Sequence, residues 1–342
     1  MRRETFSRRW LLKAAAATVP LSAVGLAPSV STAQTPIKLR LSHDEPATMI
    51  THGVLSEMAA AVEKQTNGEV TIAIFPGAQL AGGNLKTQFQ QNQAGAIDIA
   101  ITATGILNNW TPRADIISLP FLLSGVEDMK KLVSSSVGDD VKKVVEPLGL
   151  YAVDIWARDL RHWVNVKRPI VTPEDIKGLR FRVPETSLWV AAFRALGATP
   201  TPMSFGEVFT AIQLGTLDGA ERPTEFIVGE KWQSIAEYLT ISAYTGDALM
   251  PTFNKARWNS LPPDVRRILT DAFRTAGEAK FEREKSMRAY VIDTMRKAGM
   301  EVNVLTSENR EAFKRAVAPV WEQWSAKLPV GMIERAQLAV GS

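Results

Sequence analysis

The sequence predicts an α/β protein with mainly parallel sheets. Short apolar runs that end at proline or glycine alternate with amphipathic stretches, as expected where strands alternate with helices. The chain shows no heptad pattern, internal repeat or low-complexity tract that would suggest another architecture. Beyond a candidate export signal of 33 residues, 342 − 33 = 309 residues remain, which is enough for two lobes.

The first 33 residues are predicted to be an export signal outside the fold. Residues 7–13 read SRRWLLK, which has the paired arginines, apolar followers and lysine of a twin-arginine signal, and an alanine-rich stretch then leads to a cleavage site after Ala33. An ordinary Sec signal also accommodates an arginine pair, so this alternative stays open. A membrane anchor fits less well, because Pro20 and Pro28 interrupt a weakly apolar stretch. We therefore expect a periplasmic protein.

The charge of the chain belongs mostly to this signal. The whole chain carries a formal charge of +4, and the signal alone contributes 5 − 1 = +4 from Arg2, Arg3, Arg8, Arg9 and Lys13 against Glu4. The mature chain is therefore close to neutral, and its composition does not point to a nucleic-acid partner. The chain has no cysteine, so an oxidising compartment is permitted but disulfides cannot hold the fold.

The first half of the mature chain begins with a β-α-β pattern. Residues 37–42 alternate in polarity as a strand does, residues 51–66 are predicted to form a helix, and residues 69–75 form the next strand. A helix at 83–94 and a short strand at 97–100 continue the alternation. This order predicts a parallel sheet whose ligand-facing loops follow the strands.

Two polar residues follow strands of this first half. His43 comes directly after the first strand, and Thr102 comes shortly after the strand that ends at Ala100. Ligands of open α/β sheets gather beyond the carboxyl ends of strands, so both side chains are candidates for ligand contact. A local hydrogen bond within a loop is the alternative for each residue.

The stretch from Gly178 to Pro223 constrains the function most. Residues 179–183 are predicted to form a strand, with Arg182 at its end, where the chain opens. A guanidinium at this place offers a planar fork that matches a carboxylate, so Arg182 is a candidate ligand residue. The alternative is a surface arginine or one that bridges two domains.

Two helices and a short buried strand complete this stretch. The first helix ends at Gly197, and the second begins with a capping-box pair formed by Ser204 and Glu207. Phe205, beside the turn, is expected either to line a cleft or to pack in the core. Glu185, just before the first helix, is expected either to accept a hydrogen bond from a ligand hydroxyl or to stabilise the helix dipole.

The motifs of this stretch resemble a known family. The strings GLRFRVP, ALGATPTPM, EVFTAIQLG and the pattern D-G-A-E-x-P occur in this order between Gly178 and Pro223. They are similar to the solute-binding proteins of tripartite ATP-independent periplasmic (TRAP) transporters, the DctP family. The resemblance implies a two-lobed periplasmic-binding-protein fold of a type II-like kind, with a ligand cleft between the lobes and a long C-terminal helix that bridges them.

The resemblance also implies a function. A member of this family captures an organic acid through its carboxylate and delivers it to the small and large membrane subunits of an ion-gradient-driven permease, without a cofactor. A periplasmic sensor that presents the bound acid to a signalling partner, or the binding protein of an ATP-driven transporter, are the alternatives. An enzyme is not expected, because the chain has no cysteine, no zinc-type spacing of His43, His52 and His162, and no nucleophile or phosphate-loop motif.

Two further arginines enter through the resemblance. In the family, an arginine before a P-I-x-T-P-E-D segment contributes to the ligand site, and counting back eight residues from Pro169 gives Arg161. Arg158 is then expected to be structural. Arg222 stands where relatives often carry asparagine; it is expected either to contact the ligand, as a third cation for a second anionic group, or to pair with Glu221 or Glu225.

The lobe boundaries follow from the predicted crossings. Residues 149–156 are expected to form a strand that leaves lobe I, and residues 238–253 to form the strand that returns to it. A helix of some 35 residues should begin at Pro262, with two helices broken near Gly277 as the alternative. The predicted division places residues 34–156 and 246–285 in lobe I, and residues 157–245 and 286–342 in lobe II.

Overall fold

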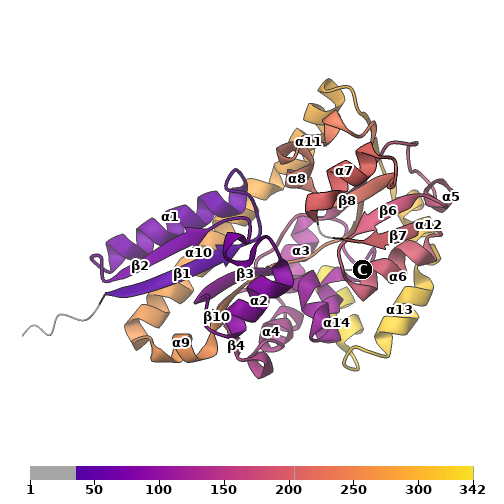
Figure 1. The fold of residues 1–342 in the computed structure, drawn as a ribbon. Coiled ribbons are helices and arrows are strands. Elements are labelled where there is room, and N and C mark those ends of the chain that lie inside the picture. The colour runs from indigo at the N-terminus through magenta and orange to yellow at the C-terminus, as the bar shows by residue number, and fades with distance from the viewer. Residues whose placement is uncertain (1–35, 204, 342) are drawn as a thin grey trace, which may run out of the picture. The chain divides into compact units, whose positions relative to one another are not determined.

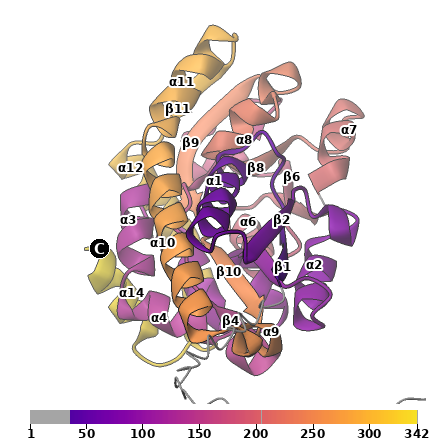
Figure 2. The same cartoon turned by 90° about the vertical axis from the view of Figure 1, so that its left-hand side faces the viewer.

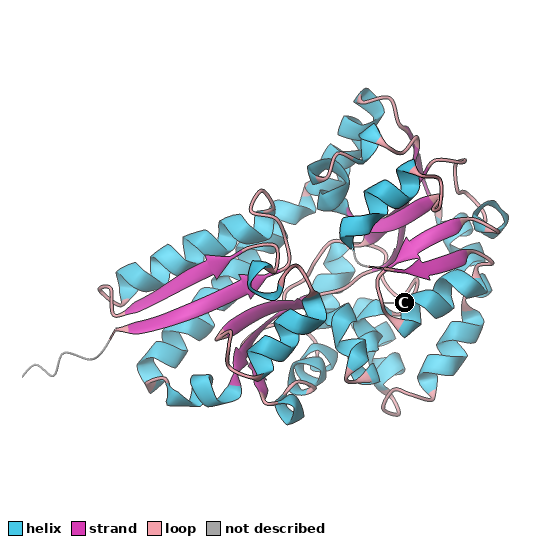
Figure 3. Ribbon diagram, in the orientation of Figure 1, coloured by secondary structure: helices cyan, strands magenta, loops and turns pink. Residues whose placement is uncertain are grey.

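Two separate sheets organise the residues that the structure, a computed structural model, describes, which are 36–203 and 205–341. Helices lie on both faces of each sheet, which confirms the α/β class and the two-lobed architecture (Figures 1 and 3). The candidate export signal lies outside the described residues. Among the residues described, no helix combines the length and apolar character needed to cross a bilayer.

The lobe I sheet has five strands in the order β2-β1-β3-β10-β4. β1 lies between β2 and β3 and is parallel to both, while β10 is antiparallel to β3 and β4. The predicted β-α-β start is therefore confirmed, and β10 enters this sheet from a distant part of the chain. The strands are β1 (Ile37–His43), β2 (Val70–Phe75), β3 (Ile99–Ala103), β4 (Leu150–Ala152) and β10 (Leu249–Asn254).

Helices α1 (Ile50–Gln65) and α10 (Pro263–Lys285) pack together on one face of the lobe I sheet. Their apolar faces meet strand residues in one buried cluster that includes Leu55, Leu269 and Phe273. Helix α2 (Leu85–Gln93) contacts β3 and β10. The remaining helices around this sheet are α3 (Val126–Val133), α4 (Ser136–Lys143), α9 (Lys255–Ser260), and the 3-10 helices η1 (Gln79–Ala81), η2 (Thr104–Asn109), η3 (Pro112–Ser118) and η4 (Glu146–Leu148).

The lobe II sheet has six strands in the order β11-β9-β5-β8-β6-β7. β6 is parallel to β7 and β8, whereas β5 is antiparallel to β8 and β9. This order places β5, β8 and β6 side by side, so that residues far apart in the chain meet at one edge. The strands are β5 (Arg161–Asn165), β6 (Arg180–Val183), β7 (Thr199–Pro202), β8 (Gly219–Pro223), β9 (Tyr238–Thr245) and β11 (Glu301–Val304).

Apolar side chains of α7, α8 and α11 form one buried cluster with the lobe II sheet. Those of α6, α12 and α13 belong to another cluster, which also contains residues of α3, η3 and α14. The helices are α5 (Pro173–Ile176), α6 (Ser187–Ala195), α7 (Val208–Gln213), α8 (Thr224–Gly229), α11 (Met287–Lys297), α12 (Ser307–Ala316), α13 (Ala318–Ser325) and α14 (Met332–Val340), with the 3-10 helices η5 (Phe205–Glu207) and η6 (Trp232–Ser234).

The two crossing strands predicted from the sequence are shorter than expected. β4 ends at Ala152, and Trp156 forms only an isolated bridge with Leu249. The expected strand at 238–253 is wrong as a single element, because β9 belongs to the lobe II sheet and β10 to the lobe I sheet. The chain must change sheets between them, and Gly246 allows this close passage: a methyl group there would lie 2.6 Å from Met129. Irregular segments at 153–160 and 246–248 therefore connect the sheets.

The long C-terminal helix is divided, but not where the sequence alternative placed the break. α10 ends at Lys285 and α11 begins at Met287, so only Ser286 separates them (Figure 2). Gly277 lies inside α10, and a methyl group there would lie 2.4 Å from the ring of Trp156. This glycine lets the helix approach the crossing segment rather than breaking the helix. α10 packs on α1 and α11 packs on α8, so the pair bridges the two lobes.

Candidate functional site

A cluster of buried charges lies where the chain crosses between the two sheets. Its members come from the loop after β1, from both crossing segments, and from neighbouring strands of the lobe II sheet. All are at most 7% exposed. We call this group the interlobe charge cluster: Glu45, Arg158, Arg161, Arg182, Glu221, Arg222 and Asp247.

Arg161 is the most heavily paired cation of the cluster. It begins β5, and its Nη2 donates to Glu221 Oε1 at 2.7 Å, while Nε donates to the other carboxylate oxygen. Nη1 donates to Asp247 at 3.4 Å, and the Tyr244 hydroxyl donates to Glu221 at 3.1 Å. Burial alone would lower the pKa of Arg161, but the carboxylates of Glu221 and Asp247 raise it above its usual range. The guanidinium is therefore held in one orientation as a cation.

Arg182 lies beside this pair, because β6 and β5 flank β8. Its Nε donates to the carbonyl of Met203 at 3.0 Å, and Nη1 lies 3.8 Å from Glu221 Oε1. Burial lowers the pKa of Arg182 to about 9; Glu221 opposes this shift, whereas Arg222 and Arg161 add to it. The positive charge at Arg182 is thus strongly disfavoured by its surroundings, and an added anion here would be stabilised.

The neighbouring arginine of the same strand has a different role. Arg180 lies two residues before Arg182 on β6, and its guanidinium pairs with Asp218 in a half-exposed position. The strand therefore places one arginine in an ordinary surface pair and the next in the buried cluster.

Arg222 forms a two-point pair with Glu230. Its Nε donates to Glu230 Oε2 at 2.9 Å, Nη2 donates to Oε1, and the guanidinium lies 4.4 Å from the ring centre of Phe226. The predicted pairing partner, Glu221 or Glu225, is wrong. Helix α8 turns the chain back, so that Glu230, eight residues later, reaches the strand again.

Arg158 connects the crossing segment to lobe I. Its Nη2 lies 2.9 Å from Glu45 Oε1, its Nη1 lies 3.5 Å from Asp247 Oδ1, and its guanidinium faces the ring of Phe226 at 5.0 Å. Glu45 and Asp247 did not stand out in the sequence, because neither belongs to a motif or a periodic pattern. Only the meeting of the two crossing segments gives them their place.

His43 and Thr102 lie inside strands, not after them. Both are buried, and Thr102 Oγ1 has no hydrogen-bond partner among the residues described. His43 Nε2 lies 3.0 Å from His52 Nδ1, and burial lowers the pKa of His43 to about 4, so the ring is neutral at pH 7. Thr102 therefore offers an unused hydroxyl at the lobe I sheet, while one ring nitrogen of His43 is already engaged.

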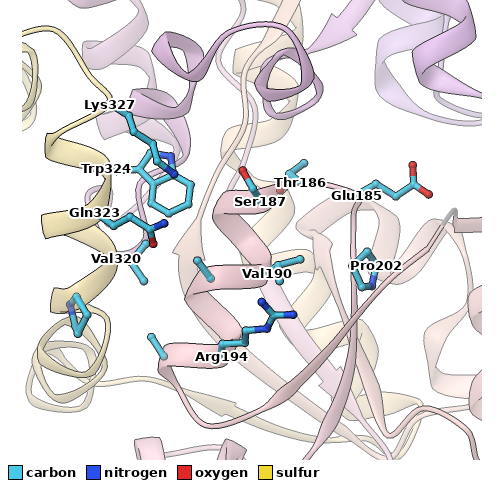
Figure 4. A pocket seen from close by; sticks show the side chains of 13 residues that line it. Glu185, Thr186, Ser187, Val190, Arg194, Pro202, Val320, Gln323, Trp324 and Lys327 are labelled. Atoms are coloured by element: carbon cyan, nitrogen blue, oxygen red, sulfur yellow. The ribbon is translucent and has the colours of Figure 1, made fainter.

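Glu185 and Phe205 are not placed in the charge cluster. The Glu185 side chain is 53% exposed and lies 3.3 Å from Lys86 Nζ of lobe I. It lines one end of a groove of about 610 Å³ between α6 and α13, which also includes Arg194, Trp324 and Lys327 (Figure 4). The backbone of Phe205 opens η5, but its side chain and the capping residue Ser204 lie outside what the structure describes.

Trp189, beside the cluster, is a further residue that the sequence did not single out for the site. It lies on α6, where its spacing indicated core packing, and it is 2% exposed. The guanidinium of Arg161 lies over its ring at 4.6 Å from the ring centre. Its indole nitrogen is buried without an acceptor among the described residues. A tryptophan six residues after an arginine-bearing strand was the available signal, but helical periodicity explained it equally well.

Residues 41–327 match the model of a family described as bacterial extracellular solute-binding protein, family 7 (DctP). The chain is 28% identical to the 2,3-diketo-L-gulonate-binding periplasmic protein of Escherichia coli, over 90% of this chain and 92% of that protein. It is also similar to a TRAP periplasmic solute-binding protein of Ralstonia eutropha solved with (S)-2-acetolactate (TM-score 0.84, 28% identity, 89% of this chain and 98% of that one). The chain is likewise similar to a TRAP periplasmic solute-binding protein of a Polaromonas species solved with D-erythronate, with a TM-score of 0.82 and 27% identity. The match covers 88% of this chain and 98% of that one.

Proposed function

Because this chain belongs to the bacterial extracellular solute-binding protein family 7, the solute-binding subunits of TRAP transporters, we propose that its interlobe charge cluster binds the carboxylate of a small organic acid. Arg182 is the principal donor to that carboxylate and Arg161 the second. The supporting observation is the buried group of guanidiniums that three adjacent strands of lobe II bring together around Glu221.

The chemistry of binding follows from this crowding. Burial and two neighbouring cations disfavour the charge on Arg182, and a ligand carboxylate would reverse that cost through a two-point, charge-assisted hydrogen bond. Because Glu221 orients Arg161, the remaining N–H groups of its guanidinium can donate to the ligand with little loss of side-chain entropy. A ligand without a carboxylate would not supply this added anion, so the site favours acids.

Contacts between the lobes on both sides of the cluster support binding by closure. On one side, Lys86 of lobe I lies 3.3 Å from Glu185, and the Ser187 hydroxyl donates to Asn108 at 2.9 Å. On the other, the amide of Ile50 donates to Glu225 at 3.4 Å. Closure around the acid would exclude water and strengthen the charged contacts.

The charge balance of the cluster supports a ligand with one carboxylate. The four guanidiniums of the cluster (Arg158, Arg161, Arg182 and Arg222) face its three carboxylates (Glu45, Glu221 and Asp247), and Glu230, outside the cluster as defined, pairs with Arg222, so that the balance with Glu230 included is 4 − 4 = 0. A single anionic group is then better tolerated than two, and Arg222 is already engaged by Glu230. The two structural relatives above were solved with acids that carry one carboxylate and a hydroxyl, which agrees with this balance.

Membership of this family also supports a proposal for where the protein acts. The family is periplasmic, and we propose export by the twin-arginine signal with cleavage after Ala33, followed by delivery of the acid to the small and large permease subunits. We retain residues 34–156 with 246–285 as lobe I and residues 157–245 with 286–342 as lobe II. Helix α14 packs on α3 and α4, so the C-terminus also contacts helices that follow the first lobe I strands.

Isothermal titration of the mature protein, residues 34–342, tests this function directly. The panel contains D-erythronate, (S)-2-acetolactate, succinate, and the uncharged sugar alcohol erythritol. We expect at least one hydroxy monocarboxylate to bind more tightly than succinate, and erythritol not to bind. Preference for succinate would contradict the single-carboxylate assignment, and binding of none of the acids would contradict the proposed function.

A further inference from the structure

The indole of Trp189 stands between the cation of one lobe and the backbone of the other. Its ring carries the Arg161 guanidinium on one face, at 4.6 Å from the ring centre. Its outer edge meets Gly105 in η2, which directly follows lobe I strand β3: a methyl group at Gly105 would lie 2.9 Å from Trp189 Cη2 and 3.2 Å from Cζ2. Trp189 therefore touches both the proposed carboxylate site and the opposing lobe.

The indole N–H of Trp189 is buried. Trp189 is 2% exposed, and its Nε1–H has no acceptor among the residues described. Among the other buried tryptophans, Trp324 donates to Asp115 at 2.6 Å and Trp232 donates to Glu230 at 2.9 Å, whereas Trp163 also lacks an acceptor among the residues described. Of the two unpaired indoles in this described part of the chain, Trp189 lies against Arg161 and Gly105. A buried donor without an acceptor is destabilising, so this N–H is expected to have an acceptor in the working state of the protein.

A second unsatisfied donor lies on the lobe I side. The hydroxyl of Thr102, on the strand that leads into η2, is buried without a partner among the described residues. A simple carboxylate that is held by Arg182 and Arg161 uses neither donor. A ligand with an additional oxygen near its carboxylate has an acceptor to offer.

Resting on the proposed function, we propose that Trp189 is a specificity-determining residue for acids that carry an oxygen on the carbon next to the carboxylate. The indole N–H donates to that oxygen, the ring face holds Arg161 in position, and the outer edge seats against Gly105 when the lobes close. One side chain thus links recognition of the ligand to closure.

Gly105 leaves room for the Trp189 ring in this contact between the lobes. Gly105 has no positive φ, so its backbone does not require glycine, and only the contact with Trp189 excludes a side chain. Alanine at this place would press a methyl group into the ring at less than van der Waals distance in the closed form. The open form would not be affected.

The experiment compares Trp189→Phe with the parent in titrations of D-erythronate and of 3,4-dihydroxybutanoate, which lacks only the 2-hydroxyl. The parent is expected to prefer D-erythronate about tenfold, and Trp189→Phe, which keeps a ring under Arg161 but lacks the N–H, to lose most of this preference. Trp321→Phe is the matched control. It removes an indole hydrogen bond of 3.0 Å to the carbonyl of Pro120, outside the cluster, and should keep the preference for D-erythronate.

Gly105→Ala tests the closure contact without changing any polar group. We expect its affinity for D-erythronate to fall about tenfold while the melting temperature of the ligand-free protein stays that of Gly125→Ala, a control glycine with nothing within 4 Å of an added methyl. Unchanged hydroxyl preference in Trp189→Phe, or parent-like affinity in Gly105→Ala, would overturn the inference while leaving the proposed function intact. A parent that binds no acid of either panel would overturn both.

Discussion

The two lobes differ in the side chains that their strands carry. Strands β5, β6 and β8 of lobe II supply Arg161, Arg182 and Arg222 to the interlobe charge cluster, whereas the lobe I strands carry a neutral His43 and the hydroxyl of Thr102, both outside the cluster as defined. In the division proposed above, lobe I adds the carboxylate of Glu45 from the loop after β1 and that of Asp247 from the crossing segment before β10. The positive charge is thus concentrated on one side.

This asymmetry suggests a division of labour. If Arg182 and Arg161 bind the carboxylate as proposed, lobe II alone supplies its donors, and they come from neighbouring strands whose spacing the sheet fixes. Lobe I would then complete the site by closing, and its side chains would contact the uncharged part of the ligand. Affinity should depend mainly on lobe II and selectivity mainly on lobe I, and the five changes below break or sharpen that comparison.

The largest effect is expected from Glu221→Gln, which removes the anion that orients lobe II. Arg161 would keep its charge with only Asp247 at 3.4 Å, and loss of one partner of a buried pair costs about 3–5 kcal/mol. Denaturant unfolding measures the change. Asp139→Asn is the control, since Asp139 and its partner Lys142 are 62% and 31% exposed and a much smaller loss is expected. Equal losses in both variants would show that Glu221 is not a special counter-ion.

Arg182→Ala should abolish most of the binding and leave the fold intact. We expect a loss of at least ~2 kcal/mol in binding free energy, since a buried charge-assisted pair is removed from the ligand side. Stability should not fall, because the variant removes a cation whose burial is unfavourable. Arg180→Ala, from the same strand, should bind as the parent does. Calorimetry that finds similar affinity for both variants would place the carboxylate elsewhere.

Glu225→Gln should change how stability depends on pH. Burial raises the pKa of Glu225 to about 8, and the carboxylates of Glu45 and Glu284 add to the shift. Because the folded form holds this proton more tightly than the unfolded form, whose pKa is 4.5, stability is lost as the pH rises from about 4.5 to about 8. The variant should lose less stability than the parent between pH 5 and pH 9, by more than ~1 kcal/mol. Parallel pH profiles in urea unfolding would refute the assignment.

Thr102→Val tests whether lobe I determines selectivity for the hydroxyl groups of the ligand. Replacing an unpartnered hydroxyl with a methyl should leave the ligand-free protein as stable or more stable. Binding of D-erythronate should weaken by ~1 kcal/mol, while binding of an acid without hydroxyl groups should not change. The ratio of the two affinities, measured by titration, is the informative quantity. A uniform loss for both acids would assign Thr102 to packing rather than to selectivity.

Glu185→Gln should have the smallest effect, although its partner lies in the other lobe. The side chains of Lys86 and Glu185 are 42% and 53% exposed, and such pairs contribute about 0–1 kcal/mol. We expect affinity within about twofold of the parent at low salt, and no difference at high ionic strength. A larger loss would mean that the rim contact, and not the buried cluster, drives closure.

Much of the fold was predictable because local patterns decide it. The β-α-β start, the strand that carries Arg182 and the helix that ends before Gly197 follow from alternation, capping and turn residues. The meeting of Arg161 with Arg182 came from resemblance, not from spacing, since twenty-one residues separate them and only sheet order joins them (182 − 161 = 21).

The remaining features depend on contacts between distant segments. Glu45 and Asp247 acquire their place where the crossing segments meet, and Arg222 finds Glu230 because α8 reverses the chain. The break at Ser286 has no glycine or proline to announce it, whereas Gly277, which looked like a break, accommodates Trp156. Local propensity is silent on each of these points, because each is decided by tertiary packing.

The most direct test is a crystal structure of the mature protein with the acid that binds most tightly in the titration panel. The account predicts the ligand carboxylate within hydrogen-bond distance of Arg182 on lobe II, and its next oxygen facing Thr102 and Trp189. A carboxylate that lies against lobe I, or that is bound through Arg222 without Arg182, would contradict the division between a lobe that holds the charge and a lobe that reads the rest.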